Sequence, residues 1–147
     1  MAVIKIREVL KHKGSAIEAV QASDTLADAI ARFGKSKVRA LVVLDGDEMV
    51  GILAIRDVLA RIDEEGPAAI EESVRDAMTS EVVSLAPEDS VDVAHELVLT
   101  NGIHHLPVLE GGQLVGLVTP VDFLGRYVTD LDRQRSMLEA YITNTVL

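Results

Sequence analysis

GLVTPVD at residues 116–122 and GILAIRD at residues 51–57 are two versions of one phrase, 65 residues apart. Each runs from an apolar stretch into a helix-starting pattern that ends on an aspartate. Sliding the chain against itself by 65 residues needs no gap and aligns further identical positions. Among them are Asp24/Asp89, Ala29/Ala94, Leu41/Leu106, Val43/Val108, Gly46/Gly111 and Val50/Val115. The chain is therefore a tandem repeat.

Both copies predict the same order of elements. AIEAV (16–20) and VVSL (82–85) are typical of a first strand, and a helix with an apolar face follows each. The predicted buried positions of these helices are Leu26, Ala29, Ile30 and Phe33, and Val91, Ala94, His95 and Val98. Hairpins follow, with strands at 40–44 and 49–54 and at 105–109 and 114–119, and then a second helix. Each copy is a β-α-β-β-α unit, and the fold class is α+β.

The predicted domain boundaries follow from the repeat and from the helix-breaking residues between the two copies. We predict a first repeat at 1–65 with its core at 16–61, a connector at 66–80, a second repeat at 81–130 and a C-terminal helix at 131–147. Gly66-Pro67 marks the connector and predicts a short helix that begins at Pro67. One unit of about 50 residues would bury too little surface alone, so the two copies should pack with pseudo-two-fold symmetry.

Composition excludes several function classes. The formal net charge of −10 argues against binding to nucleic acid or to an anionic membrane. The chain has no cysteine, which excludes disulfides and thiolate chemistry. No signal-peptide pattern and no long apolar run is present, so we expect a cytoplasmic protein with no membrane partner. Lys11, Lys13, Lys35 and Lys37 are interpreted as solvated surface rather than as an anion path.

The repeated phrase has two interpretations. Thr119, Pro120 and Asp122 form a near-ideal helix start, with Asp122 as the reciprocal partner of a capping box. In the other copy Ala54 has removed the capping hydroxyl while Asp57 remains. The alternative is functional, because a helix N-terminus with one fixed carboxylate suits an anionic ligand that carries vicinal hydroxyls, such as a nucleotide.

A tandem β-α-β-β-α unit with the pattern G-h-h-[S/T]-x-x-D (h is apolar) resembles the CBS domain, named after cystathionine β-synthase. The supporting stretches here are HHLPVLEGGQLVG, SVRDAMTSEVVSLAPEDSV and GLVTPVD, with GILAIRD in the first copy, where Ala54 departs from the pattern. The resemblance covers essentially the whole chain. It implies a pair of repeats called a Bateman module, which commonly binds AMP, ADP, ATP, NAD or S-adenosylmethionine.

The resemblance also implies two composite clefts, each built from both copies. In the better one, Asp122 and Thr119 would hold the ribose or phosphate and His104 and His105 would face the phosphate. Its adenine pocket would be lined by Ala16, Ile17, Glu18, Val38, Arg39 and Ala40. The second site would comprise Asp57, Arg56, Arg39, Met78, Thr79, Val82, Val83 and Ile103, and its Ala54 makes it the more doubtful of the two.

Other chemistries are less well supported by the sequence. His104 and His105 are adjacent on a strand and point to opposite faces, so they cannot chelate one metal ion together, and we expect no metal. His95 is predicted to be partly buried and His12 to be exposed. No nucleophile with a base and no phosphate loop is present, so we expect no enzyme and no catalytic cofactor. We expect a homodimeric regulatory sensor that signals ligand occupancy to a partner protein; the alternative is a CBS-fold assembly scaffold whose clefts bind nothing.

Overall fold

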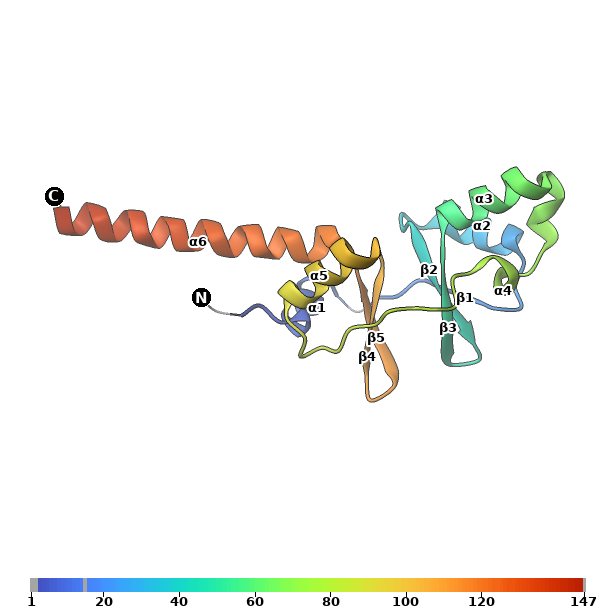
Figure 1. The fold of residues 1–147 in the computed structure, drawn as a ribbon, viewed down its shortest axis with the longest axis horizontal. Coiled ribbons are helices and arrows are strands. Elements are labelled where there is room, and N and C mark those ends of the chain that lie inside the picture. The colour runs from blue at the N-terminus through green and yellow to red at the C-terminus, as the bar shows by residue number, and fades with distance from the viewer. Residues whose placement is uncertain (1–2, 15, 147) are drawn as a thin grey trace.

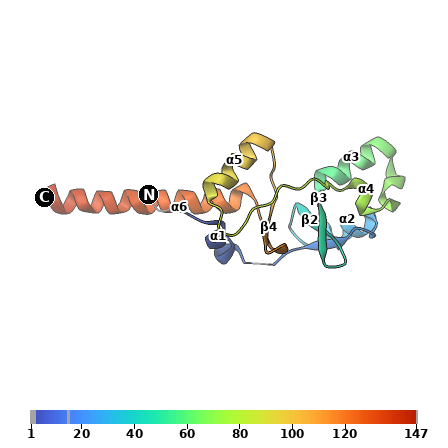
Figure 2. The ribbon, with the colours of Figure 1, turned by 60° about the horizontal axis from the view of Figure 1, so that its bottom comes forward.

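The computed structural model describes the backbone of residues 3–14 and 16–146, and the side chains of these except 124–130, 141 and 143–146. Two small sheets lie side by side with helices along one side, and one long helix extends away from them (Figures 1 and 2). The helices are α1 (Ile6–Lys13), α2 (Leu26–Lys35), α3 (Ile55–Glu65), α4 (Val74–Ala77), α5 (Val91–Asn101) and α6 (Pro120–Val146), with a 3-10 helix at Pro67–Glu71. The strands are β1 (Ala19–Gln21), β2 (Ala40–Asp45), β3 (Glu48–Ala54), β4 (Leu106–Glu110) and β5 (Gln113–Val118).

The two hairpins predicted from the repeat are present and equivalent. β2 pairs antiparallel with β3, and β4 with β5, and each ladder shifts register at the matching position, between Val43 and Leu44 and between Val108 and Leu109. Gly46 and Gly111 have positive φ angles of 67° and 59° in the turns, a conformation that glycine adopts without steric cost. The repeated glycines therefore fix the same hairpin geometry twice.

The first strands of the two copies differ, which corrects the prediction of a strand at 82–85. β1 runs parallel to β2, whereas its counterpart contributes a single bridge between Leu85 and Val108. In the first copy the amides of Val42 and Ala22 donate to the carbonyls of Glu18 and Leu44, at 3.0 and 2.8 Å. The equivalent positions in the second copy are Pro107 and Pro87, which have no N–H to donate. Two prolines thus shorten the strand.

Two further expectations are corrected. Ile30 and His95, which occupy equivalent positions in α2 and α5, were predicted to be buried, but Ile30 is 39% exposed and His95 is also exposed. Both lie at the solvent-facing edge of the apolar face of their helix, whose buried residues are Leu26 and Ala29 in α2 and Val91 and Ala94 in α5. The C-terminal helix does not begin at 131. It is continuous with the helix that starts at Pro120, since no residue between them breaks the pattern. The short helix predicted at Pro67 is present as a 3-10 turn.

Each repeat is completed by a segment that precedes the other one. We call residues 4–13 the first lead segment and residues 72–79 the second lead segment. The first supplies Ile4, Ile6 and Val9 to a core with Leu106 and Phe123. The second supplies Val74 to the other core, with Leu26, Leu41 and Leu53. The predicted limits of the repeats stay a prediction, but the packing crosses them in both directions.

The hydrogen bonds of the lead segments repeat the same exchange. The first lead segment bonds to the second repeat through Val91 N to Ile4 O, Ile6 N to Asp89 O and Arg7 N to Pro87 O, at 2.8–2.9 Å. The second bonds to the first repeat through Leu26 N to Glu72 O, Val74 N to Asp24 O and Arg75 N to Ala22 O, at 2.7–3.1 Å. Every partner in one set is the counterpart of a partner in the other. The two halves are therefore related by a pseudo-two-fold exchange of lead segments.

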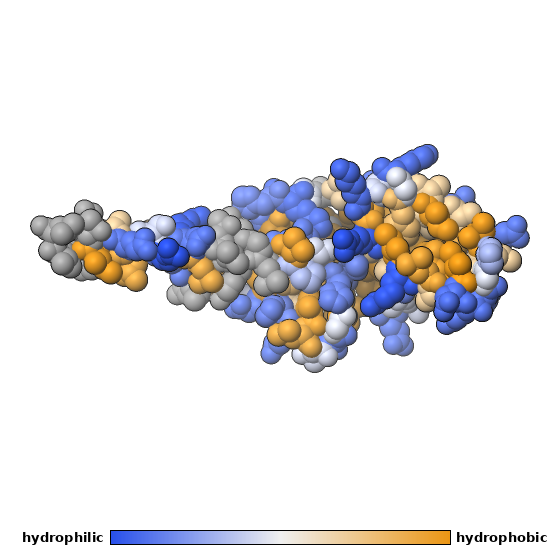
Figure 3. All heavy atoms as spheres, turned by 90° about the horizontal axis from the view of Figure 1, so that it is seen from above, coloured by the Kyte–Doolittle hydropathy of each residue, from blue (hydrophilic) through white to orange (hydrophobic). Residues whose placement is uncertain are grey.

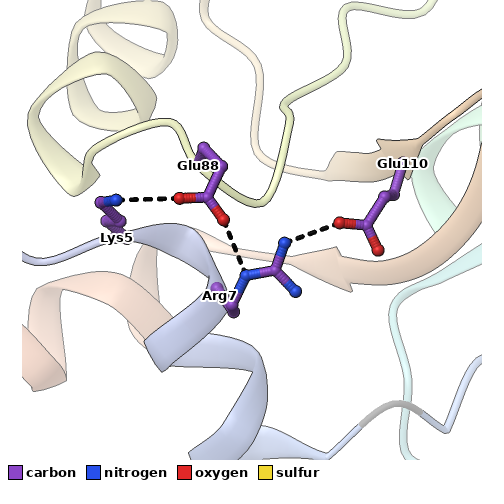
Figure 4. A network of polar contacts seen from close by, with 4 residues as sticks. All are labelled: Lys5, Arg7, Glu88 and Glu110. Carbon is purple, nitrogen blue, oxygen red and sulfur yellow. Dashed lines mark hydrogen bonds and ion pairs between the residues drawn. The ribbon is translucent and has the colours of Figure 1, made fainter.

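Ion pairs follow the same exchange. Arg7 donates to Glu110 at the end of β4 and Arg75 to Asp45 at the end of β2, at 2.6 and 3.2 Å. Figure 4 shows that Arg7 also bonds Glu88, which in turn accepts from Lys5. The hydrogen bonds from Lys5 and Arg7 lower the pKa of the Glu88 carboxyl. These ion pairs are exposed, and exposed pairs add little to stability. They therefore orient the lead segments, whereas burial in the apolar cores stabilises the packing of these segments.

The glycine of the repeated phrase is a site of close approach to a lead segment. A Cβ at Gly51 would lie 2.7 Å from both the Thr79 carbonyl oxygen and the Met78 sulfur, whereas a Cβ at Gly116 would meet only the side-chain tip of Leu10. We expect Gly51→Ala to lower the free energy of unfolding by about 1–3 kcal/mol, since a backbone oxygen cannot rotate away. Gly116→Ala should lower the free energy of unfolding by less, because the side chain of Leu10 can move away. Urea unfolding of both variants measures the difference, and equal losses would contradict the argument.

Candidate functional site

The two aspartates of the repeated phrase occupy the same position at the start of a helix. Asp57 accepts the backbone N–H of Ala54 through Oδ2 at 2.8 Å, and Asp122 accepts that of Thr119 at 2.8 Å. Both carboxylates therefore perform half of a capping box, and both are partly buried. The other half is absent at Thr119, because the Asp122 N–H goes to the Thr119 carbonyl at 3.0 Å. Instead the Thr119 hydroxyl donates to Asp122 Oδ2, at 3.0 Å.

This geometry explains how Ala54 is tolerated. The bond that both copies share uses a backbone N–H of residue 54 or 119, so it does not depend on the side chain there. The hydroxyl of Thr119 adds one more donor to the carboxylate of Asp122. The replacement thus changes how the aspartate is held, and it leaves the helix start intact.

The carboxylate of Asp122 has a partner that the sequence did not indicate. Lys13 Nζ, at the end of α1, lies 2.7 Å from Asp122 Oδ2 and donates to the Leu117 carbonyl at 2.6 Å. Lys13 comes from the first lead segment, so the exchange of lead segments creates this contact. The sequence predicted Lys13 to be solvated surface, because nothing in its local pattern distinguishes it from Lys11.

The second lead segment reaches the corresponding place near Asp57. Thr79 pairs with Ile52 of β3 through two backbone hydrogen bonds of 2.9 and 3.0 Å. β3 ends at Ala54, directly before the helix that carries Asp57. The backbone N–H of Ile55 donates to the Arg39 carbonyl at 3.0 Å, which brings the end of the 36–39 loop to the same helix start. Met78, Thr79, Arg39 and Arg56 of the predicted second site are therefore brought toward Asp57.

The residues predicted to line the adenine pocket of the Asp122 cleft differ in their burial. Ala40 is 2% exposed within β2, and Val38 packs against the core of the first repeat. Glu18 faces Arg32 of α2, 3.5 Å away. The side chains of Ala16 and Arg39 are exposed and that of Ile17 is partly buried. In the second site Val82 and Val83 are partly buried, and Ile103 packs against the core of the second repeat.

His105 lies within electrostatic reach of charged residues that belong to both candidate clefts. It is partly buried in front of β4, while His104 is exposed. Burial lowers the pKa of His105, and the positive charges of His104, Lys13 and Arg56 lower it further, whereas Asp57 raises it. Lys13 belongs to the Asp122 cleft and Arg56 and Asp57 to the other. His105 thus lies within electrostatic reach of charged residues of both clefts, and its predicted place at the phosphate of the Asp122 cleft stays a prediction.

The lowered pKa of His105 predicts a pH dependence of stability. The unfolded state takes up a proton near the usual pKa of 6.5 and the folded state only at lower pH, so stability should fall as the pH drops below about 6.5. Thermal unfolding between pH 7.5 and 5.5 measures the fall. His105→Gln should reduce it, whereas His95→Gln, at an exposed position, serves as the control. An equal fall in wild type and His105→Gln would contradict the assignment.

No metal site is evident in the part of the chain that the structure describes, where no three His, Asp or Glu side chains converge. Two shallow, open depressions are present. One is lined by Glu18, Asp28, Ala31, Arg32, Lys35 and Ser36, and the other by Arg7, Leu10, Lys11, Gly14, Pro87, Glu110 and Val115. Neither includes Asp57 or Asp122. Among the described residues, no helix is long and apolar enough to cross a membrane.

Comparison with known proteins identifies the family. The model of the CBS domain matches residues 6–64 and 74–129. The chain belongs to the CBS-domain family. The "CBS domain-containing protein CBSX3, mitochondrial" of Arabidopsis thaliana is 31% identical over 146 residues, which are 93% of this chain and 71% of that protein. An inosine-5'-monophosphate dehydrogenase of Methanocaldococcus jannaschii is 32% identical over 109 residues, 73% of this chain and 21% of the enzyme.

Solved structures agree on the fold. A putative signal-transduction protein with CBS domains from Burkholderia ambifaria is 30% identical, with a TM-score of 0.80 over 86% of this chain and 95% of that one. CBSX2 in complex with AMP is 22% identical, with a TM-score of 0.71 over 86% of this chain and 97% of that one. The CBS domain pair of protein MJ0100, in complex with 5-methylthioadenosine and S-adenosyl-L-methionine, is 17% identical, with a TM-score of 0.76 over 88% and 99%. The predicted α+β tandem CBS fold is confirmed.

Proposed function

We propose that this CBS protein is a non-enzymatic regulatory module that binds an adenosine ligand and signals its occupancy to a partner protein. The observation that carries the proposal is the pair of equivalent carboxylates, Asp57 and Asp122. Each is fixed at a helix start by a backbone N–H. The first lead segment contacts Asp122 through Lys13, and the second pairs with Ile52 of the strand that leads to Asp57. A fixed carboxylate accepts hydrogen bonds from the two hydroxyls of a ribose, and the helix start favours a phosphate.

The family supports the choice of ligand class. CBSX2 was solved with AMP, and the pair of MJ0100 with 5-methylthioadenosine and S-adenosyl-L-methionine. AMP, ADP, ATP, NAD and S-adenosylmethionine share the ribose that Asp57 or Asp122 would hold. The proposed site residues are those predicted from the sequence, with the Asp122 cleft as the better one. The non-enzymatic role remains part of the proposal, because one of the matched relatives is a dehydrogenase.

The signalling mechanism we propose is ligand-biased packing of the two repeats. Because each cleft takes residues from both halves, a ligand would favour the relative orientation for which it has the higher affinity. Lys13 lowers and Asp57 raises the pKa of His105, so a change in the relative orientation of the two halves would alter its titration. The ligand can shift the orientation only as far as its affinities for the two arrangements differ.

We also propose that the protein is a homodimer. Apolar surface gathers over the helices of the first repeat (Figure 3), where Ile30 of α2 and Ile55 and Leu59 of α3 are 39%, 37% and 61% exposed. A second copy that covers these helices would remove this apolar surface from water. The regulated partner and the cytoplasmic location stay predictions, and the Arabidopsis relative is named a mitochondrial protein.

The alternative is a CBS-fold assembly scaffold with empty clefts. One observation favours it, since neither of the two depressions described above, both formed by described residues, includes Asp57 or Asp122. Isothermal titration with AMP, ATP, NAD and S-adenosylmethionine separates the two functions. The proposal expects binding of at least one ligand, and mass spectrometry of ligand co-purified with the protein would identify it. Absence of heat and of thermal shift with all four ligands would favour the scaffold.

A further inference from the structure

The ion pair between Lys13 and Asp122 makes the two candidate clefts chemically different. Lys13 Nζ contacts Asp122 Oδ2 at 2.7 Å, and the same oxygen accepts from the N–H and the hydroxyl of Thr119. The side chains of Lys13 and Asp122 remain 32% and 20% exposed, so a ligand can reach the pair. Among the described residues, Asp57 accepts one hydrogen bond, from the backbone of Ala54. In the part of the chain that the structure describes, an ion pair is thus formed by the carboxylate of Asp122 and not by that of Asp57.

Lys13 has capacity left for a ligand. An ammonium group carries three N–H donors. Two of them go to Asp122 Oδ2 and to the Leu117 carbonyl, at 2.7 and 2.6 Å. The third is available to an oxygen atom of a molecule that sits on Asp122. Among the residues whose side chains the structure describes, the three donors to Asp122 meet at Oδ2, and none contacts Oδ1, the oxygen that we assign to the ribose hydroxyls.

Lys13 places a positive charge at this cleft although the chain as a whole is strongly acidic. Lys13 and Arg56 both lie within electrostatic reach of His105, and Asp57 is the negative charge within that reach. A ligand bound at Asp122 with its ribose on Oδ1 would therefore place its 5' substituent in a region of positive charge. Such a region attracts a phosphate and repels a sulfonium cation.

We propose that Lys13 makes the Asp122 cleft selective for adenosine ligands that carry a phosphate on the ribose, over adenosine ligands that are neutral or cationic there. The inference rests on the proposed function and adds the ligand charge that this cleft prefers. Lys13 acts by direct contact with the phosphate, while Asp122 and the ribose provide the interaction common to all adenosine ligands.

The test compares AMP with adenosine, which differ only by the phosphate. Titrations in an Asp57→Asn background confine the measurement to the Asp122 cleft. Lys13→Met should reduce the preference for AMP over adenosine by about tenfold, with adenosine affinity nearly unchanged. Lys13→Arg should retain most of the preference. Lys11→Met removes the same charge from the same helix and is the matched control, in which the preference should persist. The preference should also shrink as salt rises.

Two results would overturn the inference. An unchanged preference in Lys13→Met would show that Lys13 does not contact the phosphate. A parallel loss of both affinities would show that Lys13 only positions Asp122. Either outcome leaves the proposed function intact, because a ligand still binds. If neither AMP nor adenosine binds the wild-type protein and its thermal midpoint does not move, both the inference and the adenosine site fail together. Thermal unfolding of each variant verifies that it is folded.

Discussion

Ile6→Ala is expected to lower the free energy of unfolding by about 2–5 kcal/mol and to loosen the second repeat rather than the first. Ile6 is fully buried, in a core with Leu106, Val118 and Phe123. Truncation would leave a cavity among residues that are about 100 positions away in the sequence. Native-state hydrogen exchange resolves the effect by region, and the amides of β4 and β5 should lose protection first.

Val74→Ala is the reciprocal variant. Val74 is also fully buried, but its core is that of the first repeat, with Leu26, Leu41 and Leu53. The smaller side chain should cost about 2 kcal/mol, and the amides of β2 and β3 should lose protection. If each variant weakened the repeat that adjoins it in the sequence, the exchange of lead segments would be wrong.

Asp122→Ala is expected to weaken binding of the adenosine ligand at its cleft by about 10- to 100-fold, because a hydrogen-bonding charged group is lost. It also removes the partner of Lys13 and the acceptor for the Thr119 N–H. Some stability should be lost as well, about 1 kcal/mol for the helix start. Isothermal titration in the Asp57→Asn background measures the affinity, and thermal unfolding measures the stability.

Asp28→Ala is the matched control for Asp122→Ala. Asp28 accepts the N–H of Thr25 at 3.0 Å, with the same three-residue spacing at the start of α2, and this bond lowers the pKa of its carboxyl. Asp28→Ala should lower the thermal stability of the protein and leave its affinity for the adenosine ligand unchanged. Retained affinity in Asp122→Ala, with a loss of stability like that of Asp28→Ala, would mean that Asp122 is a helix cap and no ligand residue.

Much of the fold could be predicted from local patterns. The hairpins follow from buried strand compositions around Gly46 and Gly111, and the helix starts follow from residues such as Thr25 and Ser90. The shortened first strand of the second repeat could have been predicted too, since Pro87 and Pro107 are visible in the sequence and lack the donors that their counterparts use. The local composition of 82–85 favours a strand, but the backbone N–H donors that Pro87 and Pro107 lack leave this segment with a single bridge to β4.

The exchange of lead segments was beyond sequence reasoning. Ile6 and Val74 sit in similar short patterns, IREV and VRDA, and either core could accept either one on hydrophobicity alone. The available signal was a difference in spacing. Arg7 and Arg75 are 68 residues apart, whereas equivalent residues of the repeats are 65 apart, which sets the lead segments apart from the repeats that follow them. The contact of Lys13 with Asp122 depends on this exchange, so it could not be found either. The candidate ribose aspartates were predicted because the repeat retains them.

The crossed packing of the lead segments also sets an order of events during synthesis on the ribosome. Ile4, Ile6 and Val9 are synthesised more than 100 residues before Phe123, with which they share a core. At roughly 5–20 residues per second, they wait about 6–23 seconds for that partner. The other core can be complete once Met78 has emerged, because its members lie between Val20 and Met78. The nascent chain can therefore complete the core of the first repeat while the first lead segment still lacks its partners, and that segment packs only when the second repeat has been synthesised.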